Sequence, residues 1–382
     1  MNLTRLFSPK NIGSIRIKNR IVRSATYTRK SEKYGIVGKE LIDFYEELAQ
    51  GGTGLIISEF IGVDPSGTAS AYQLRLDNDS FIPGQKELVK SVHNYSEVKI
   101  AAQIAHTGRQ GAHPKYHPVA PSSVTDKITG LTPRELTIPE IKVLIQKFVA
   151  AAKRAYESGY DMVQLHAAHG YLLSNFISPY TNRRSDDYGG TNKNMARILL
   201  EIYDGIQDDV GKNFPITIKL QTQDFVPKGL ELDQSLEIAK ILIKKGFDAI
   251  EPSGGIGETQ IGSKNAYPSR QIKSPDEENY FLPTVKVLKP IMKNSKMILM
   301  GGIKNPVSAD NFIKEGITDF ISLSRPLIYE PNLPNRWMNG DLRPAKCISC
   351  NSCYVTIFTG PVYCVVRRRL EKKEQRKAKD KK

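Results

Sequence analysis

Two histidines and a tyrosine lie within six consecutive residues, His166-Ala-Ala-His169-Gly-Tyr171. The spacing of three places both imidazoles on one side of a turn, with the tyrosine hydroxyl nearby. Neutral imidazoles can donate hydrogen bonds to a carbonyl oxygen or an oxyanion, and a tyrosine can supply a proton as general acid. A histidine pair can also bind a metal, but further ligands are normally needed, and none is spaced convincingly here.

The cysteines form a second pattern, because all four lie within 18 consecutive residues, at Cys347, Cys350, Cys353 and Cys364. Thiolates at spacings of three can surround one metal group, and a more distant cysteine can complete the ligand set. Four cysteines can equally bind tetrahedral zinc, or the segment can be vestigial or purely structural. A disulfide framework is not expected, because the N-terminus lacks the apolar core of an export signal.

Polar residues interrupt two apolar runs: Gln103 lies within 100–105 and Lys219 within 216–220. A polar group in a buried strand must find a partner. An uncharged ring with carbonyl and imide edges would serve both, since Gln103 can donate and accept at such an edge. Lys219 would then stabilise negative charge developing on the ring. The alternative is that Lys219 reaches an internal carboxylate.

Two further segments have the character of an anion site: Gly301-Gly302 and Ser324-Arg325. Glycines let backbone N–H groups approach an anion, and a following helix N-terminus adds a favourable dipole. Arg325 can add a charge-assisted contact. Together these segments predict a phosphate-bearing ring cofactor beneath the histidine pair.

The elements that would position these residues alternate between short apolar strands and longer amphipathic helices. The expected strands are Arg20–Ala25, Gly54–Phe60, Lys99–Ala105, Met162–Ala167, Pro215–Leu220, Ala249–Pro252, Met297–Gly302 and Phe320–Ser324. The expected helices are Lys39–Gln50, Ile138–Ser158, Asn194–Val210, Leu232–Lys245, Glu277–Lys293 and Val307–Glu315.

This rhythm predicts an α/β fold of the (β/α)8 TIM-barrel type over residues 1–340, followed by a Cys-rich extension with a basic tail over 341–382. A doubly wound open sheet is disfavoured, because no GxGxxG fingerprint follows the first strand. The segments 106–137 and 254–276 are longer than barrel geometry needs. Both follow strand C-termini, so they are candidate lids or substrate-facing loops.

The formal net charge of +15 is concentrated at the end of the chain, where residues 367–382 hold ten Lys/Arg against three Asp/Glu. A solvated terminal helix with a frayed end is the favoured interpretation of this tail, and nucleic-acid binding is not expected. No uninterrupted apolar run approaches about 18 residues. We therefore expect a cytoplasmic protein without a membrane span, and a homo-oligomer is compatible with the sequence.

At the level of whole motifs, the chain resembles the old yellow enzyme family of flavin mononucleotide (FMN) oxidoreductases. The motifs occur in family order over about 340 residues: Leu6-Phe-Ser-Pro, Asn19-Arg-Ile-Val, Gln103-Ile-Ala-His-Thr-Gly-Arg109, the His166 segment, Phe176-Ile-Ser-Pro-Tyr-Thr-Asn-Arg183, Asp187-Tyr-Gly-Gly190 and Ser324-Arg-Pro-Leu327. The resemblance implies FMN at the barrel mouth, reduced by NADH or NADPH, and hydride transfer to an activated alkene such as an enone or enoate.

The resemblance also implies a role for each residue. The flavin would be bound by Ala25, Thr26, Gln103, Lys219, Gly301, Gly302, Ser324 and Arg325, with the last four at the phosphate. His166 and His169 would bind the electron-withdrawing oxygen of the substrate, and Tyr171 would protonate the alkene carbon. The family usually has Thr or Cys beside flavin O4, where this chain has Tyr27, so the pocket can be narrower.

The cysteine spacing resembles the iron–sulfur motif of larger relatives, although the last interval differs. We therefore expect an iron–sulfur cluster in preference to zinc. Three functions follow from these patterns: an FMN-dependent NAD(P)H ene-reductase, which is favoured; an FMN/iron–sulfur dehydrogenase of amine or enoyl type that passes electrons to an external carrier; and a basic binding protein with an inert barrel. The complete His166–Tyr171 segment argues against the third.

Overall fold

Eight parallel strands close into a barrel in the computed structural model, which describes residues 3–111, 113–260 and 269–380. The barrel strands are β3 (Ile21–Arg23), β4 (Leu55–Ile57), β6 (Lys99–Ala105), β9 (Met162–Ala167), β10 (Ile216–Gln223), β11 (Ala249–Gly254), β12 (Lys296–Leu299) and β13 (Phe320–Leu323). Each pairs with its neighbour in chain order, and β13 pairs with β3 to close the ring. All eight predicted strands and the predicted (β/α)8 barrel are confirmed.

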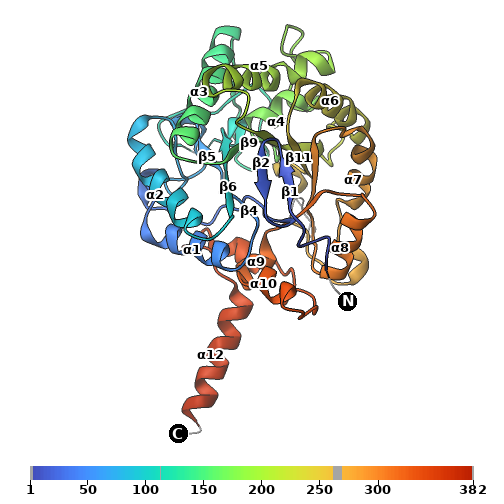
Figure 1. Ribbon diagram of the computed structural model, residues 1–382. Coiled ribbons are helices and arrows are strands. Elements are labelled where there is room, and N and C mark those ends of the chain that lie inside the picture. The colour runs from blue at the N-terminus through green and yellow to red at the C-terminus, as the bar shows by residue number, and fades with distance from the viewer. Residues whose placement is uncertain (1–2, 112, 261–268, 381–382) are drawn as a thin grey trace.

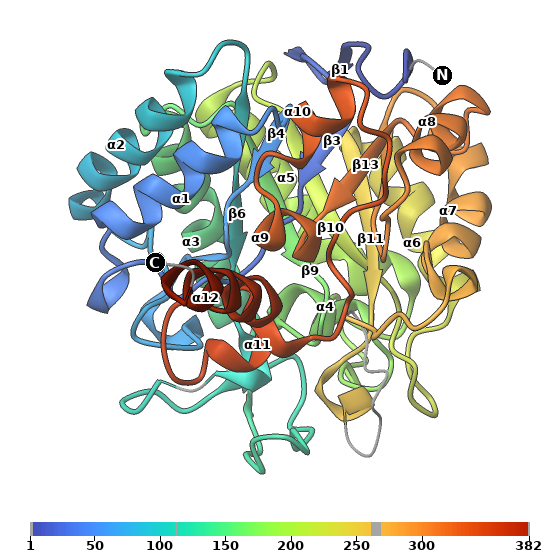
Figure 2. The same cartoon turned by 90° about the horizontal axis from the view of Figure 1, so that it is seen from below.

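A β-hairpin covers the N-terminal end of the barrel. It consists of β1 (Lys10–Ile12) and β2 (Ile15–Ile17), paired antiparallel. Ile12 and Ile17 are fully buried in a cluster with interior residues of the barrel strands, such as Phe320. Figure 2 shows β1 of this hairpin at one end of the barrel and α11 (Ser352–Thr356), which contains Cys353, at the opposite end. The chemistry-bearing residues therefore lie at the open, C-terminal end.

Seven longer helices surround the strands (Figure 1), and their apolar faces form the main core outside the barrel. They are α1 (Lys39–Gln50), α2 (Ile82–His93), α3 (Ile138–Glu157), α5 (Asn192–Val210), α6 (Leu232–Lys245), α7 (Leu282–Leu288) and α8 (Pro306–Lys314). The sequence missed α2. The single helix predicted over 277–293 is wrong: α7 ends at Leu288 and a 3-10 turn follows, since Pro290 cannot continue the α-helical hydrogen bonding.

Short elements follow several strand ends. The strands are β5 (Ile61–Gly62), β7 (Val119–Ala120) and β8 (Arg134–Glu135), and the short α-helices are α4 (Leu172–Ile177), α9 (Arg325–Tyr329) and α10 (Leu333–Met338). The 3-10 turns are η1 (Lys33–Gly35), η2 (Pro65–Gly67), η3 (Asp79–Phe81), η4 (Gly108–Gln110), η5 (Gly257–Gln260), η6 (Pro275–Glu277) and η7 (Lys289–Ile291). The candidate lid 254–276 is described in part, because residues 261–268 lie outside the described residues.

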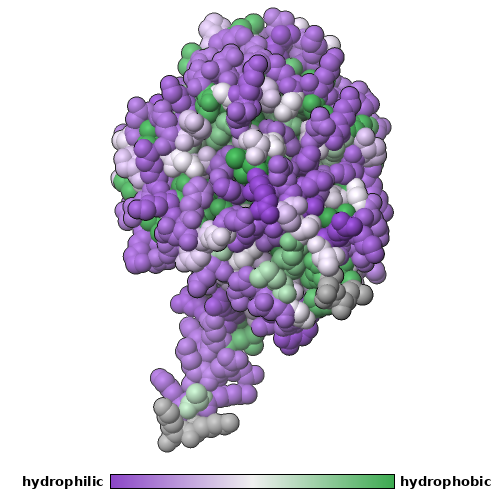
Figure 3. Space-filling view, viewed as in Figure 1, coloured by the Kyte–Doolittle hydropathy of each residue, from purple (hydrophilic) through white to green (hydrophobic). Residues whose placement is uncertain are grey.

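The chain then returns over the open end of the barrel through residues 346–364, which we call the cysteine segment and which contain α11 (Ser352–Thr356). The terminal helix α12 (Val365–Lys379) projects from the body in Figure 1, has no buried residue and is almost entirely hydrophilic in Figure 3. The solvated terminal helix is thus confirmed, while the division at residue 340 stays a prediction. Among the described helices, none is long and apolar enough to cross a membrane.

Candidate active site

The strand register gathers polar side chains at one level inside the barrel. Gln103 on β6 lies opposite Gln164 on β9, and the Gln103 amide donates to Gln164 Oε1 over 2.6 Å. Gln164 in turn donates to Glu251 Oε2 on β11 over 3.1 Å. All three side chains are buried. Because parallel strands in register carry their side chains to the same layer, distant parts of the sequence form one hydrogen-bonded belt.

Lys219 belongs to the same belt, where it forms a buried ion pair. Its ammonium lies 2.7 Å from Glu251 Oε2, since Lys219 on β10 and Glu251 on β11 are register partners. Ser24 and Ser322 each donate to Glu251 Oε1 over 2.8 Å. Burial alone would raise the pKa of Glu251, but the Lys219 ammonium and the serine hydroxyls outweigh burial, and the pKa is lowered. The alternative, that Lys219 reaches an internal carboxylate, is therefore what the structure shows, while a contact between Lys219 and a ring cofactor stays a prediction.

His166, His169 and Tyr171 come together at the end of β9. The His166 ring lies 5.0 Å from the His169 ring and 4.9 Å from the Tyr171 ring, centroid to centroid. Among the described residues, the buried Nδ1 of His166 has no hydrogen-bond partner. A buried polar atom without a partner is costly, so this nitrogen is suited to bind a ligand group.

His169 is held from several directions. Its φ of 65° is uncommon for a residue with a side chain. Its backbone N–H donates to Gln221 over 2.8 Å, its carbonyl accepts from Gln110 over 2.8 Å, and its Nε2 lies 2.7 Å from the Ser253 hydroxyl. These bonds stabilise the strained turn and fix the imidazole orientation.

Burial sets the protonation of this group. Burial, followed by the charge of Lys219, lowers the pKa of His169 to about 3. Burial also lowers the pKa of His166 well below its ordinary value, and both His169 and Lys219 add to that effect. Burial raises the pKa of Tyr171, with smaller effects of Tyr354 and Tyr27. Both imidazoles are therefore neutral near pH 7, and the tyrosine keeps its proton.

An aromatic wall adjoins these residues. The Phe60 ring lies 5.3 Å from the Tyr27 ring and 5.6 Å from the Tyr171 ring. The Tyr27 hydroxyl lies 2.5 Å from the Ser70 hydroxyl. Tyr27 is thus fixed by packing and a hydrogen bond, while the narrowing of the substrate pocket by this side chain stays a prediction.

Ala25 and Thr26, which are predicted to lie next to the flavin ring, come shortly after β3 in the sequence and directly before Tyr27. Ala25 packs against the cluster in the barrel interior. Thr26 Oγ1 donates to the Ser24 carbonyl over 3.0 Å and lies 2.8 Å from the Ser324 hydroxyl. This contact links the loop after β3 to the C-terminal end of β13.

The predicted phosphate residues line one small cavity with Ser24 and Ser322. Gly301 and Gly302 have φ values of 105° and 81°. A Cβ on Gly302 would lie 2.5 Å from the Ile272 side chain, and one on Gly301 would lie 2.8 Å from the Phe281 ring. Only glycine therefore fits both positions. We call this cavity the cradle; at Gly301 and Gly302 its wall is backbone without a side chain.

Arg325 lines the cradle but is also bound to the protein. Its Nη1 donates to the Arg270 carbonyl over 2.7 Å, the Ser349 carbonyl over 3.3 Å and the Asn351 side chain over 2.5 Å. Among the described residues, no carboxylate pairs with it. The guanidinium of Arg325 therefore lies at the cradle, as predicted from the sequence. Its orientation is set by hydrogen bonds to two loops, which were not predicted from the sequence.

A buried charge cluster joins the two long loops that were predicted as candidate lids or substrate-facing loops. Arg109 contacts Glu258 through Nη2, and the same nitrogen lies 3.4 Å from Asp126 Oδ2. All three side chains are almost fully buried. Breaking a buried ion pair on one side costs about 3–5 kcal/mol. The loops 106–137 and 254–276, as far as they are described, are thus fastened to each other.

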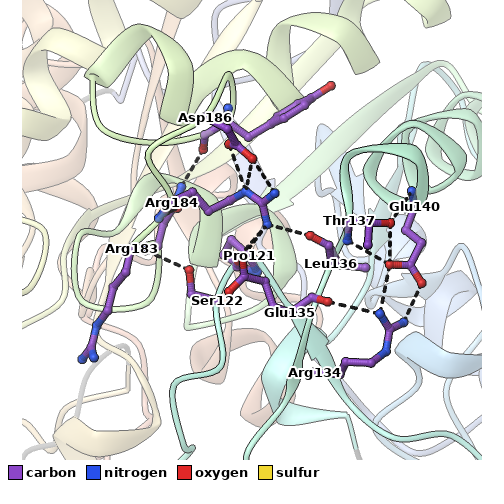
Figure 4. A network of polar contacts seen from close by, with 12 residues as sticks. Pro121, Ser122, Arg134, Glu135, Leu136, Thr137, Glu140, Arg183, Arg184 and Asp186 are labelled. Atoms are coloured by element: carbon purple, nitrogen blue, oxygen red, sulfur yellow. Dashed lines mark hydrogen bonds and ion pairs between the residues drawn. The ribbon is translucent and has the colours of Figure 1, made fainter.

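Figure 4 shows a second fastening, around Arg184 in the loop after α4. Its guanidinium donates to the Pro121 and Leu136 carbonyls over 2.9 and 2.6 Å and pairs with Asp186 over 2.6 Å. The neighbouring Arg183 donates its backbone N–H to Ser122, while its side chain points away. Arg184 therefore joins the residues that follow β7 and β8 to the loop between α4 and α5.

The four cysteines are free thiols and line one small pocket together with Arg325. In residues 3–111, 113–260 and 269–380, no group of three or more His, Cys, Asp or Glu side chains is arranged to hold a metal ion. The four predicted metal ligands thus line one pocket, but their sulfur atoms are not arranged to coordinate a metal ion. A single zinc ion would need all four sulfur atoms at about 2.3 Å.

Comparison with known proteins agrees with this geometry. Residues 5–342 match the family described as NADH:flavin oxidoreductase / NADH oxidase. The chain belongs to this family. The resemblance to the old yellow enzyme family is thereby confirmed. The family relative from Thermoanaerobacter brockii, an NADH oxidase, is 41% identical over 353 residues, which are 91% of this chain and 52% of that protein.

Solved structures extend the comparison. A 2-naphthoyl-CoA reductase has a TM-score of 0.87 at 27% identity, covering 95% of this chain and 56% of that one. The old yellow enzyme homologue from Zymomonas mobilis has a TM-score of 0.73 at 26% identity, covering 87% and 92%. The chain therefore spans about half the length of the NADH oxidase and of the 2-naphthoyl-CoA reductase.

Sequence reasoning missed three residues of this site: Gln164, Glu251 and Ser253. Gln164 and Glu251 interrupt apolar strands just as Gln103 and Lys219 do, so the same argument could have found them. Ser253 carries no such signal, because a serine at a strand end is common.

Proposed function

We propose that this family member binds FMN at the open end of the barrel and uses NAD(P)H to reduce activated C=C bonds. The observation that carries the proposal is the buried Nδ1 of His166, which has no hydrogen-bond partner among the described residues, on a ring whose centroid lies 4.9 Å from that of Tyr171. In the tautomer that carries its proton on Nδ1, His166 would place a hydrogen-bond donor next to a proton donor, which suits an alkene conjugated to a carbonyl. Bound FMN would supply the hydride.

The residues of the chain would divide the remaining work. A neutral His166 and His169 would donate hydrogen bonds to the substrate oxygen, where negative charge increases during reduction. Tyr171 would donate its proton to the carbon that does not receive hydride. Neutral imidazoles suit this role, because a cationic ring beside Lys219 would be opposed by charge repulsion and by burial.

The fit of FMN rests on the chain's own groups. The cradle offers bare backbone at Gly301 and Gly302 together with the Arg325 charge, which are suited to a phosphate. Gln103 and Lys219 would meet the polar edge of the ring system, and Ala25 and Thr26 its side. Gln103 and Lys219 belong to the belt, and Thr26 is linked to the cradle through the Ser324 hydroxyl.

The proposal is tested with anaerobically purified protein. We expect a yellow protein that NADH or NADPH bleaches and that an enone such as cyclohexenone reoxidises. The matched control is the His93→Asn variant, which changes an exposed histidine at the C-terminal end of α2, where the chain leads into β6, and should behave as wild type. A protein that bleaches but is never reoxidised by enones would contradict the ene-reductase assignment.

The pocket lined by all four cysteines favours a second candidate, an FMN/iron–sulfur dehydrogenase that passes electrons to an external carrier. The four thiols line a shared pocket but are not close enough together to bind a single ion. An iron–sulfur cluster is larger than a zinc ion and would suit this spacing better. Iron, sulfide and zinc assays of anaerobic protein separate these cases. Zinc without iron would contradict the cluster, and neither metal would contradict a metal role for the cysteines.

A further inference from the structure

The cysteine segment binds several loops at the open end of the barrel. Val362 donates its backbone N–H to the Thr28 carbonyl over 2.8 Å, and Arg29 donates to the Ile357 carbonyl over 2.8 Å. Both contacts fasten the segment to the loop that carries Ala25 and Thr26. The segment is thus part of the wall around the candidate flavin site.

The segment also lines the cradle. Ser349 is among the cavity's lining residues, together with Ser269 from the loop after β11. The cradle therefore combines the ends of β12 and β13 with two segments that lie outside the barrel strands. One of these two segments carries the cysteines.

Asn351 joins three of these parts through one side chain. Its Oδ1 accepts from Arg325 Nη1, and its Nδ2 donates to the Ser269 carbonyl, each over 2.5 Å. Its backbone φ is 61°, a left-handed conformation that Asn tolerates better than most residues. An asparagine is required here because the position needs an acceptor, a donor and this backbone conformation at once.

Arg325 depends on these bonds for its orientation. Its Nη1 is surrounded by three acceptors, of which Ser349 and Asn351 belong to the cysteine segment. Elsewhere in the described residues, Nε and Nη2 of Arg325 have no hydrogen-bond partner, so these donors are free for an anion. The three acceptors hold one edge of a rigid, planar guanidinium, which fixes the direction of the other donors.

We infer that Asn351 is a positioning residue for the flavin phosphate: it orients Arg325 toward the cradle from within the cysteine segment. The inference rests on the proposed FMN site. It gives the segment a function in flavin binding that does not require electron transfer. Because Asn351 lies between Cys350 and Cys353, any group that holds those two thiols would also hold Asn351, and binding at one site would strengthen the other.

The test compares FMN with riboflavin, which lacks the phosphate. Dissociation constants are measured by flavin fluorescence on protein stripped of flavin, for wild type, Asn351→Ala and the control Asn294→Ala at an exposed position near the opposite end of the barrel. Hydrogen bonds to charged groups are strong, so Asn351→Ala should bind FMN about 10- to 100-fold more weakly. Riboflavin binding should be unchanged, and the control should match wild type for both ligands.

Equal weakening of FMN and riboflavin in Asn351→Ala would overturn the inference, because it would show a general structural role. Unchanged FMN binding would also overturn it. Should Asn351→Ala fail to fold, Asn351→Asp preserves the shape and the left-handed backbone preference while adding a negative charge beside Arg325. It should weaken FMN selectively, and equal effects on both flavins would again contradict the inference. Wild-type protein that binds neither flavin would contradict the proposed function itself.

Discussion

Glu59 offers the most quantitative prediction, because it is a fully buried carboxyl near the end of β4 with an incomplete set of partners. Its Oε2 accepts from the Thr28 backbone N–H over 2.9 Å and from the Thr28 hydroxyl, whereas Oε1 has no partner among the described residues. Burial raises the pKa of Glu59 from 4.5 to about 7, although the Thr28 bonds and the nearby Arg23 charge oppose the shift.

The sign of the effect follows from proton binding. Between pH 4.5 and pH 7 the folded chain keeps a proton on Glu59 that the unfolded chain has released. The free energy of unfolding contributed by this group therefore falls as pH rises, and the loss is complete above pH 7. With folded and unfolded pKa values of about 7 and 4.5, the loss between pH 5 and pH 8 is about 2.5 kcal/mol.

Glu59→Gln removes this titration while imitating the protonated acid, since an amide offers one acceptor and donors on the other atom. We expect the variant and wild type to have similar stability at pH 5. At pH 8 the variant should be more stable by about 2.5 kcal/mol. The measurement is urea unfolding at both pH values.

The control for this experiment is Glu87→Gln, which changes an exposed carboxylate on α2 and should differ from wild type by less than about 0.5 kcal/mol at both pH values. If Glu59→Gln shows the same pH dependence as wild type, the reasoning is refuted. In that case the Arg23 guanidinium would be holding the Glu59 carboxylate ionised across the whole range.

Three further predictions concern the active site. Tyr171→Phe should slow alkene reduction at least about 100-fold in stopped-flow measurements while leaving flavin reduction by NAD(P)H nearly unchanged, and equal losses would contradict its role as proton donor. Lys219→Met should lower the free energy of unfolding by about 3–5 kcal/mol because it leaves Glu251 unpaired. The double variant Lys219→Met/Glu251→Gln should recover most of that loss, and no recovery would contradict the pairing. The lowered pKa values of His166 and His169 predict alkene reduction without an inflection between pH 5 and pH 8 from these groups. An inflection near pH 6.5 that His166→Asn abolishes would show a protonated ring.

The barrel could be predicted because the signal is repeated. Eight apolar strands alternate with helices, and a parallel strand buried on both faces is a continuous apolar run that the sequence displays directly. One helix prediction failed because a single proline ends the α-helix, as Pro290 does after α7. A second error falls where a helix carries a weak apolar pattern, as α2 does with Leu88, Val89 and Val92.

The positions of the predicted site residues followed from the same logic, but their partners did not. Strand order and register bring Lys219 opposite Glu251, and neither can be read from local spacing. The bond between Arg325 and Asn351 is harder still, because it joins a strand end to a returning segment. Such contacts depend on how loops close over the barrel, and loop paths have no periodic sequence signal.

The charges of the site also indicate which ligand it suits. At the belt, Lys219 is neutralised by Glu251, and both imidazoles are neutral near pH 7 because their pKa values are lowered. At the other end, Arg325 faces the cradle without a carboxylate partner in the described chain. A ligand that is uncharged at one end and anionic at the other is therefore matched in both places, whereas a ligand with a charged ring would be opposed by burial. Because the groups at the two ends come from β9, β10, β11 and α9, replacing any single charge should weaken binding of one end of the ligand more than binding of the other end.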